Sequence, residues 1–143
     1  MKAVVPLPPI LLVEDNPMDL DLTLRAFGKT RLSHTILIAR DGEEALAFLP
    51  RWEAGEPLPA VILLDINMPR VNGLEVLQRL KEHPVFRRIP VVVLTSSCED
   101  RDLKTAYDLG VNSYIEKPVS FSHFIELAEH IERYWCGFNA RPF

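Results

Sequence analysis

Acidic, hydroxyl and ammonium side chains follow four of the short apolar runs in this sequence. Glu14 and Asp15 follow the first run, Asp65 follows a later one, and Thr95 and Lys117 end or follow two more. Three carboxylates brought together would repel one another at neutral pH unless a cation lay among them. If the fold gathers these positions, the residues predict a site for a hard divalent cation beside a carboxylate nucleophile.

Oxygen ligands of this kind favour Mg²⁺, which typically uses one or two protein carboxylates and keeps several waters at about 2.0–2.1 Å. We expect Asp15 and Asp65 to bind the ion directly, with the backbone carbonyl of Asn67 as a third protein ligand. Glu14 is expected to hold a metal-bound water. Such an ion also leaves room for a phosphoryl oxygen.

A carboxylate can form an acyl phosphate, and Asp65 is the candidate nucleophile. The cation and Lys117 would neutralise the charge of an incoming phosphoryl group from opposite sides. Thr95 could donate its hydroxyl to a phosphoryl oxygen. The residues therefore predict transfer of a phosphoryl group onto Asp65.

Each of these residues also has a purely structural interpretation. Glu14-Asp15-Asn16 could form only a helix cap, and Asp65 could be a turn residue after a strand. Thr95 and Lys117 could be ordinary strand-end residues. Their joint occurrence at four strand ends favours one shared site over four unrelated features.

Five apolar runs are expected to form the strands that position these residues. They are rich in Val, Ile and Leu and mostly do not alternate with polar residues, which is typical of strands buried on both faces of a parallel sheet. Amphipathic segments between them predict helices on both faces, joined by right-handed crossovers. In such open sheets, ligands bind at the carboxyl ends of the strands. The runs are Ile10–Val13, Thr35–Ala39, Val61–Leu64, Val91–Leu94 and Tyr114–Ile115.

Capping residues and apolar stripes predict the helices. Asn16-Pro17 predicts one helix start, Gly110 a left-handed helix end, and the segment from about Ser120 to Trp135 the last helix. Three pairs repeat the spacing of a capping box: Asp41 with Glu44, Asn72 with Glu75, and Ser97 with Asp100. The expected inward faces are Leu20/Thr23/Leu24/Phe27, Ala45/Phe48/Leu49/Trp52, Leu103/Ala106/Tyr107 and Phe121/Phe124/Ile125/Ala128.

Length and composition indicate one ordinary globular domain. The 143 residues suit a single domain, for which we expect an N-terminal tether (residues 1–9), a folded domain (10–136) and a C-terminal tail (137–143). With a net charge of −4 and scattered basic residues, duplex nucleic acid is a disfavoured partner. No apolar stretch suits a membrane helix. Cys98 and Cys136 form no metal-binding pattern, and we expect a cytoplasmic protein.

Four segments resemble, in order, the motifs of the response-regulator receiver family: ILLVEDNP, ILLDINMPRVNG, VVVLTSS and YIEKPV. The separations of 30 residues from Asp65 to Thr95 and 22 from Thr95 to Lys117 are similar to those of that family. The resemblance covers Ile10 to Trp135. We therefore expect a flavodoxin-like, doubly wound (βα)₅ fold whose five-stranded parallel sheet has the order 2-1-3-4-5.

The resemblance implies a role for each site residue. Asp65 would be the phosphoacceptor for a histidine kinase, Glu14 and Asp15 the acidic pair at a Mg²⁺ site, and Lys117 the phosphate-contacting lysine. The chain would be a signalling phosphoacceptor and no enzyme beyond its own aspartyl phosphorylation and dephosphorylation.

The resemblance also marks a switch and a departure. Thr95 and Tyr114 match the switch positions of the family, and the bond from Lys117 to Pro118 is expected to be cis. Ser96 departs from the family, which often has Ala or Gly there. Because no output module fits after Trp135, the signal is expected to leave through the receiver surface to an unknown downstream protein.

A narrower resemblance involves NPMDLDLTLRAF, a surface loop expected at Arg51–Pro59, YDLGVNSYIEKPVSF and IERYW. These segments are similar to single-domain receivers linked to phytochromes, which implies a bacteriophytochrome kinase as partner and a homodimer. Four aromatic residues near the end could either cover the sheet edge or form the dimer contact: Tyr134, Trp135, Phe138 and Phe143.

Two other functional classes use similar architecture. A haloacid-dehalogenase-like phosphatase needs a second Asp two residues after its nucleophile as general acid, and this chain has Asn67 there. A flavodoxin-like FMN carrier would need an anion-binding loop after the first strand, where Glu14-Asp15 would repel phosphate. Both remain alternatives at the level of sequence.

Overall fold

The computed structural model describes residues 7–31 and 33–143, so most of the predicted tether, residues 1–6, lies outside the described part. Strands and helices alternate along the chain, as the sequence predicted. Among the described residues, no helix combines the length and apolar character that crossing a membrane would need. The elements are β1 (Ile10–Val13), α1 (Pro17–Gly28), β2 (Ile36–Ala39), α2 (Gly42–Leu46), α3 (Phe48–Glu53), β3 (Val61–Leu64), α4 (Gly73–Glu82), the 3₁₀ turn η1 (Phe86–Arg88), β4 (Val91–Thr95), α5 (Asp100–Asp108), β5 (Ser113–Glu116), α6 (Phe121–Arg133) and the π-helical turn η2 (Tyr134–Phe138).

The five strands form one parallel sheet in the order β2-β1-β3-β4-β5, which confirms the predicted fold and strand order. The three inner strands, β1, β3 and β4, are buried along their whole length. Val13 pairs with Leu64, and Leu64 pairs with Val93. This register brings the residues that follow β1 and β3 to one edge of the sheet.

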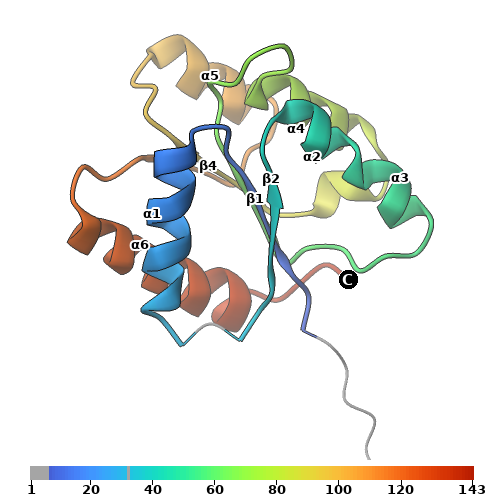
Figure 1. Ribbon diagram of the computed structural model, residues 1–143. Helices are drawn as coiled ribbons and strands as arrows, with labels where there is room; N and C mark the ends of the chain where they lie inside the picture. Colours follow the sequence, from blue (N-terminus) through green and yellow to red (C-terminus); the bar gives the residue numbers. More distant parts are fainter. Residues whose placement is uncertain (1–6, 32) are drawn as a thin grey trace, which may run out of the picture.

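Helices cover both faces of the sheet (Figure 1). Helices α1 and α6 pack on one face, over the side chains of Ile10, Leu12 and Val61. The other face packs against α2, α3 and α4 with residues such as Leu11 and Val13. Burying apolar surface on both faces stabilises a parallel sheet, whose strands have no solvent-exposed side.

Four of the five predicted helix starts are confirmed. The side chains of Asn16, Asp41, Asn72 and Ser120 each accept backbone N–H bonds at the first turn of their helices. The capping box expected at Ser97 and Asp100 is wrong, because the cap position of α5 is Glu99. The Ser97 hydroxyl instead donates to Asp102 (2.6 Å).

Several predicted inward side chains are exposed. Ala106 is buried in α5, but Leu103 and Tyr107 are exposed, and in α6 Phe121 is exposed while Phe124 and Ala128 are buried. Only part of each predicted face is therefore turned toward the core. The predicted stripes were therefore too wide on the last two helices.

The helix after β2 and the following loop differ from the prediction. One continuous helix was expected, but α2 ends at Leu46 and α3 starts at Phe48. Pro50 has no N–H to donate to the Leu46 carbonyl four residues earlier, and its ring crowds that carbonyl. Helix α3 then runs to Glu53, so the loop expected from Arg51 begins after that residue.

The end of the chain continues as helix beyond the predicted limit. Helix α6 passes into η2, which reaches Phe138, so the boundary expected between residues 136 and 137 falls inside this turn. Trp135 packs partly buried against the α1–α6 layer. Phe138 and Phe143 are exposed. Tyr134 is exposed as well, so one of the four aromatic residues covers the core and three remain accessible.

Candidate functional site

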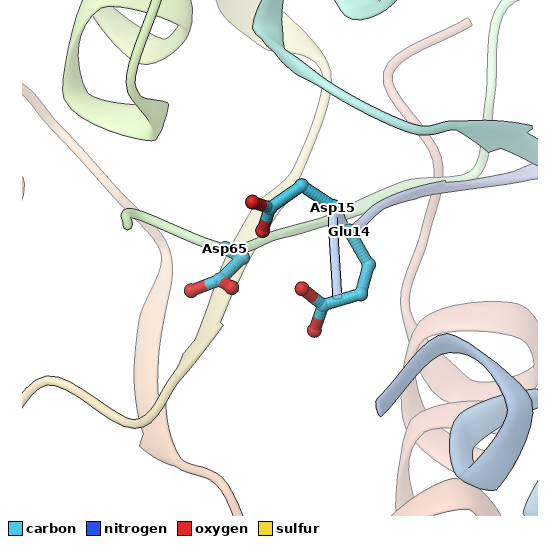
Figure 2. Close-up of side chains that lie close together, drawn as sticks. All are labelled: Glu14, Asp15 and Asp65. Atoms are coloured by element: carbon cyan, nitrogen blue, oxygen red, sulfur yellow. The ribbon is translucent and has the colours of Figure 1, made fainter. Parts of the chain in front are cut away.

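The three predicted carboxylates meet at the carboxyl edge of the sheet (Figure 2). Glu14, Asp15 and Asp65 each place a carboxylate oxygen within 4.8 Å of the others. Glu14 and Asp65 are only 3% and 5% exposed, and Asp15 is half-buried. The sequence thus correctly predicted that these side chains come together.

Backbone hydrogen bonds that extend the sheet by one residue fix this geometry. The Glu14 N–H donates to the Ala39 carbonyl (3.0 Å), and the Asp65 N–H donates to the Val13 carbonyl (3.1 Å). The acidic residues therefore occupy the first positions after β1 and β3 in a fixed register. The ladder hydrogen bonds therefore hold the Cα atoms of Glu14 and Asp65 close together.

The loop after β3 packs tightly against the backbone of Asp65. A Cβ atom added to Gly73, at the start of α4, would lie 2.1 Å from the Asp65 carbonyl oxygen. The Gly73 N–H donates to the Ile66 carbonyl (2.9 Å). Asn67 is exposed between these two points. Glycine is therefore required where α4 begins directly behind the candidate nucleophile.

Lys117 extends into the acidic cluster from the end of β5. Its ammonium group lies 2.5 Å from Glu14, 2.8 Å from Asp19 and 3.1 Å from Asp65, and its side chain is 7% exposed. The Lys117 N–H donates to the Thr95 carbonyl (2.8 Å), which continues the β4–β5 ladder. One buried ammonium thus pairs with three carboxylates.

Asp19 is the member of this group that the sequence interpretation missed. It lies in the first turn of α1, four residues after Asp15 in the sequence. Acidic residues are common in first helical turns because they complement the helix dipole. Because the helix dipole alone accounts for an acid at this position, the local sequence does not reveal that Asp19 also pairs with Lys117, which lies 98 residues away in the sequence.

Burial and like charge act together on the carboxylates. Burial, the largest cause, and the neighbouring Asp65 together raise the pKa of Glu14 to about 8, against the opposing effect of Lys117. Burial alone would lower the pKa of Lys117, but hydrogen bonds to Asp19 and Glu14 outweigh it and hold this pKa above its usual range. The cluster carries more negative charge than one ammonium balances.

The oxygen atoms present fit a hard divalent cation. Within the described residues, Oδ1 of Asp65 is buried without a hydrogen-bond partner. An unpaired buried carboxylate oxygen is costly unless a cation or another donor contacts it. Since Mg²⁺ binds through carboxylate oxygens and water, the acidic cluster is suited to a divalent metal.

Thr95 and Tyr114 are linked through one residue, Ser97. The Thr95 hydroxyl oxygen accepts a bond from the Ser97 N–H (3.2 Å), and the Tyr114 hydroxyl donates to the Ser97 carbonyl (3.2 Å). Thr95 is fully buried and Tyr114 half-buried, whereas Ser96 is exposed. A movement of the Thr95–Ser97 segment would therefore reach Tyr114 directly.

The bond between Lys117 and Pro118 is trans, and no peptide bond among the described residues is cis. The expectation of a cis bond, which came from the resemblance, is therefore wrong for this structure. Trans is the lower-energy form of a bond preceding proline.

The response regulator receiver domain is the family whose model matches this chain, over residues 10–129. The probable methanogenesis regulatory protein FilR2 of Methanothrix harundinacea is 46% identical over 134 residues, which cover 93% of this chain and 86% of that protein. The response regulator Rcp1 of Synechocystis sp. is 40% identical over 128 residues, covering 88% and 87%.

Three solved structures are closely similar in fold. The phosphorylated cyanobacterial phytochrome response regulator RcpA has a TM-score of 0.87 and 38% identity, covering 95% of this chain and 99% of that chain. The Mn²⁺-bound form of Rcp1 has a TM-score of 0.85 and 37% identity, with coverages of 95% and 99%. The bacteriophytochrome response regulator RtBRR has a TM-score of 0.75 and 47% identity, with coverages of 95% and 84%.

Proposed function

The chain belongs to the response regulator receiver domain family, and from this premise we propose that Asp65 accepts a phosphoryl group from a histidine kinase. The protein is a receiver of two-component signalling and not a classical enzyme. The observation that carries the proposal is the buried, unpaired Oδ1 of Asp65, which lies beside two further carboxylates and a buried ammonium.

The two alternative functions are not supported. The comparisons yield receivers rather than phosphatases or flavin carriers. Asn67 stands where a phosphatase of the haloacid-dehalogenase kind needs an acid, and an amide cannot exchange a proton usefully at neutral pH. Glu14 and Asp15 crowd the edge where a flavin phosphate would bind.

Glu14, Asp15 and Asp65, together with the backbone carbonyl of Asn67, are the residues we propose for Mg²⁺. The mutual distance of the three carboxylates supports this set, as does the metal-bound form of the similar protein Rcp1. When bound, the ion supplies positive charge to phosphoryl oxygens. Glu14 is proposed to hold a metal-bound water and not to bind the ion directly.

The bonds that form and break in the proposed transfer belong to this chain and to the phosphodonor. A carboxylate oxygen of Asp65 attacks phosphorus, forming a P–O bond, while the P–N bond of the donor phosphohistidine breaks. Its electron pair returns to the imidazole nitrogen, which takes up a proton. Lys117, already 3.1 Å from Asp65, contacts a phosphoryl oxygen and offsets its charge. The chain is thus proposed to catalyse its own phosphorylation and, with water as nucleophile, its dephosphorylation.

Thr95 and Tyr114 are proposed to change conformation when Asp65 is phosphorylated. The Thr95 hydroxyl would donate to a phosphoryl oxygen, moving the segment to which Ser97 belongs. Because Tyr114 donates to the Ser97 carbonyl, its ring would reorient with that segment. The half-buried ring can therefore change the surface between α5 and α6, where a downstream protein would bind.

The similar phytochrome response regulators support a light-sensing bacteriophytochrome as the kinase partner. We further propose a homodimer, since Tyr134, Phe138 and Phe143 are exposed aromatic residues near the C-terminus and aromatic residues dominate interface energetics. A cytoplasmic location is proposed because Cys98 and Cys136 are free thiols, as in reducing compartments.

The decisive experiment is phosphorylation by a small phosphodonor, such as phosphoramidate, with Mg²⁺. Intact mass should show one added phosphoryl group on the parent chain and none on Asp65→Asn. Asp21→Asn is the matched control, because Asp21 is an exposed carboxylate that pairs with Arg25 away from the cluster. Equal labelling of the parent and Asp65→Asn would disprove the assignment, and steady turnover of a phosphate monoester would indicate a phosphatase.

A further inference from the structure

The Lys117 ammonium has three N–H donors, and three carboxylates surround it. Glu14, Asp19 and Asp65 all lie within 3.1 Å of its nitrogen. A phosphoryl oxygen can therefore bond to Lys117 only if one of these carboxylates gives up its contact. Which carboxylate remains decides where the ammonium is held during the reaction.

Asp19 differs from the other two because it does not belong to the acidic cluster proposed for the cation. That cluster consists of Glu14, Asp15 and Asp65. The carboxylate oxygens of Glu14 and Asp65 would therefore serve the metal site as well as Lys117. Asp19 is 29% exposed and belongs to a different element, the first turn of α1. Its contact with Lys117 is the one that the reaction does not require to break.

The backbone of Asp19 is held firmly at the start of α1. Its N–H donates to the side-chain oxygen of Asn16 (3.1 Å), and its carbonyl accepts from the Thr23 hydroxyl (2.7 Å). The helix cap thus fixes the carboxylate that in turn fixes Lys117. Fixed geometry matters because a charged group positioned in advance stabilises developing charge without reorganisation.

We propose that Asp19 is a positioning residue that anchors the Lys117 ammonium beside Asp65, so that Lys117 exchanges Glu14 for a phosphoryl oxygen while it keeps its bond to Asp19. The inference rests on the proposed function of Asp65. Asp19 itself does not contact the reacting atoms. It acts through Lys117 alone, so its effect on the reaction should disappear when Lys117 is replaced.

The first test measures the rate of Asp65 labelling by phosphoramidate at saturating Mg²⁺, over a range of donor concentrations. Asp19→Ala should lower the maximal rate on the order of tenfold, the scale of one lost hydrogen bond to a charged group. The half-saturating donor concentration should not rise, since a repelling carboxylate has been removed. Asp19→Asn, which keeps an acceptor oxygen, should recover part of the rate.

The control Asp21→Ala removes a carboxylate from the same helix without touching Lys117 and should label like the parent. In a Lys117→Gln background, adding Asp19→Ala should cause no further loss. A Mg²⁺ affinity within about twofold of the parent is expected for Asp19→Ala. Parent-like labelling of Asp19→Ala, or a full additional loss in the Lys117→Gln background, would overturn the proposal.

A second readout does not depend on phosphorylation. In metal-free protein at low temperature, the ¹⁵N ammonium signal of Lys117 should be visible because its hydrogens are protected, and in Asp19→Ala it should broaden through faster exchange. An unchanged signal would refute the anchoring contact. If instead the signal responds as expected but the parent is never phosphorylated, the proposed function fails, and with it any part that Asp19 plays in the reaction.

Discussion

Asp15 is the carboxylate of the acidic cluster that makes no ion pair within the described part of the chain, while Glu14 and Asp65 both contact Lys117. Asp15 therefore contributes mainly repulsion until a cation binds. We expect Asp15→Asn to stabilise the metal-free protein by about 1 kcal/mol, the scale of one partly screened repulsion between charges. Functional sites commonly give up stability in this way.

The same variant should lose its response to metal. For the parent chain, Mg²⁺ at a hundred times its dissociation constant should add about 2.7 kcal/mol to the free energy of unfolding. Asp15→Asn should gain little of this, whereas Asp21→Asn should respond as the parent does. Urea unfolding with and without Mg²⁺ measures both effects, and a full Mg²⁺ response in Asp15→Asn would remove Asp15 from the metal site.

For single residues, the sequence predicted the site correctly where a charged side chain followed the end of a predicted strand. Glu14, Asp15, Asp65 and Lys117 were all placed correctly by that rule. Asp19 was missed because helical position alone explains an acid in a first turn, and its partner comes from a segment with no sequence relation to it. Contacts between side chains of distant elements are not visible in a local pattern.

Among the elements, helix α4 can pack close behind Asp65 because Gly73, its first residue, has no side chain. A Cβ atom at Gly73 would lie 2.1 Å from the Asp65 carbonyl oxygen, and rigid backbone cannot yield as a flexible side chain can. We expect Gly73→Ala to destabilise the fold by about 1–3 kcal/mol, the usual cost of overpacking. It should also slow labelling of Asp65, since relief of the clash moves the backbone that carries the nucleophile.

Gly28→Ala is the matched control for this prediction. Gly28 ends α1, and an added Cβ there meets no atom within 4 Å. That change should be neutral or stabilise the protein by up to about 1 kcal/mol, because alanine favours helix more than glycine does. Thermal unfolding and phosphoramidate labelling of both variants test these two expectations. If Gly73→Ala melts and labels like the parent, close packing behind Asp65 is not required.

The elements that the sequence predicted well are those with an unambiguous pattern. The bounds of β1 and β3 match because both runs are apolar throughout and end at charged residues. The break between α2 and α3 was missed, because the stripe of apolar residues continues across Pro50 and hides the lost hydrogen bond. Leu103, Tyr107 and Phe121 have helical spacing but are exposed, which only the tertiary arrangement shows.

At the scale of the whole molecule, the proposed phosphorylation site and the C-terminal aromatic residues lie at opposite ends. The site occupies the carboxyl edge of the sheet, whereas η2 follows α6 back toward the amino-terminal edge. There, Leu7, His34 and Phe138 line a cavity of about 420 Å³. A dimer formed through this end would leave Asp65 free to meet a kinase.

The proposed homodimer is best tested by substitution rather than by deletion of residues 137–143, because Gly137 and Phe138 belong to η2 and their removal would disturb the end of α6. Phe138 is 78% exposed, so Phe138→Ser should not harm the folded monomer. If its ring is a central contact, the dimer dissociation constant should rise at least about tenfold, as for an aromatic hot spot.

Val119→Ser is the control, since Val119 is fully exposed at the other end of the molecule. Light scattering at matched concentrations should show a lower mean mass for Phe138→Ser alone, and an equal mass for all three proteins would exclude this end as the dimer contact.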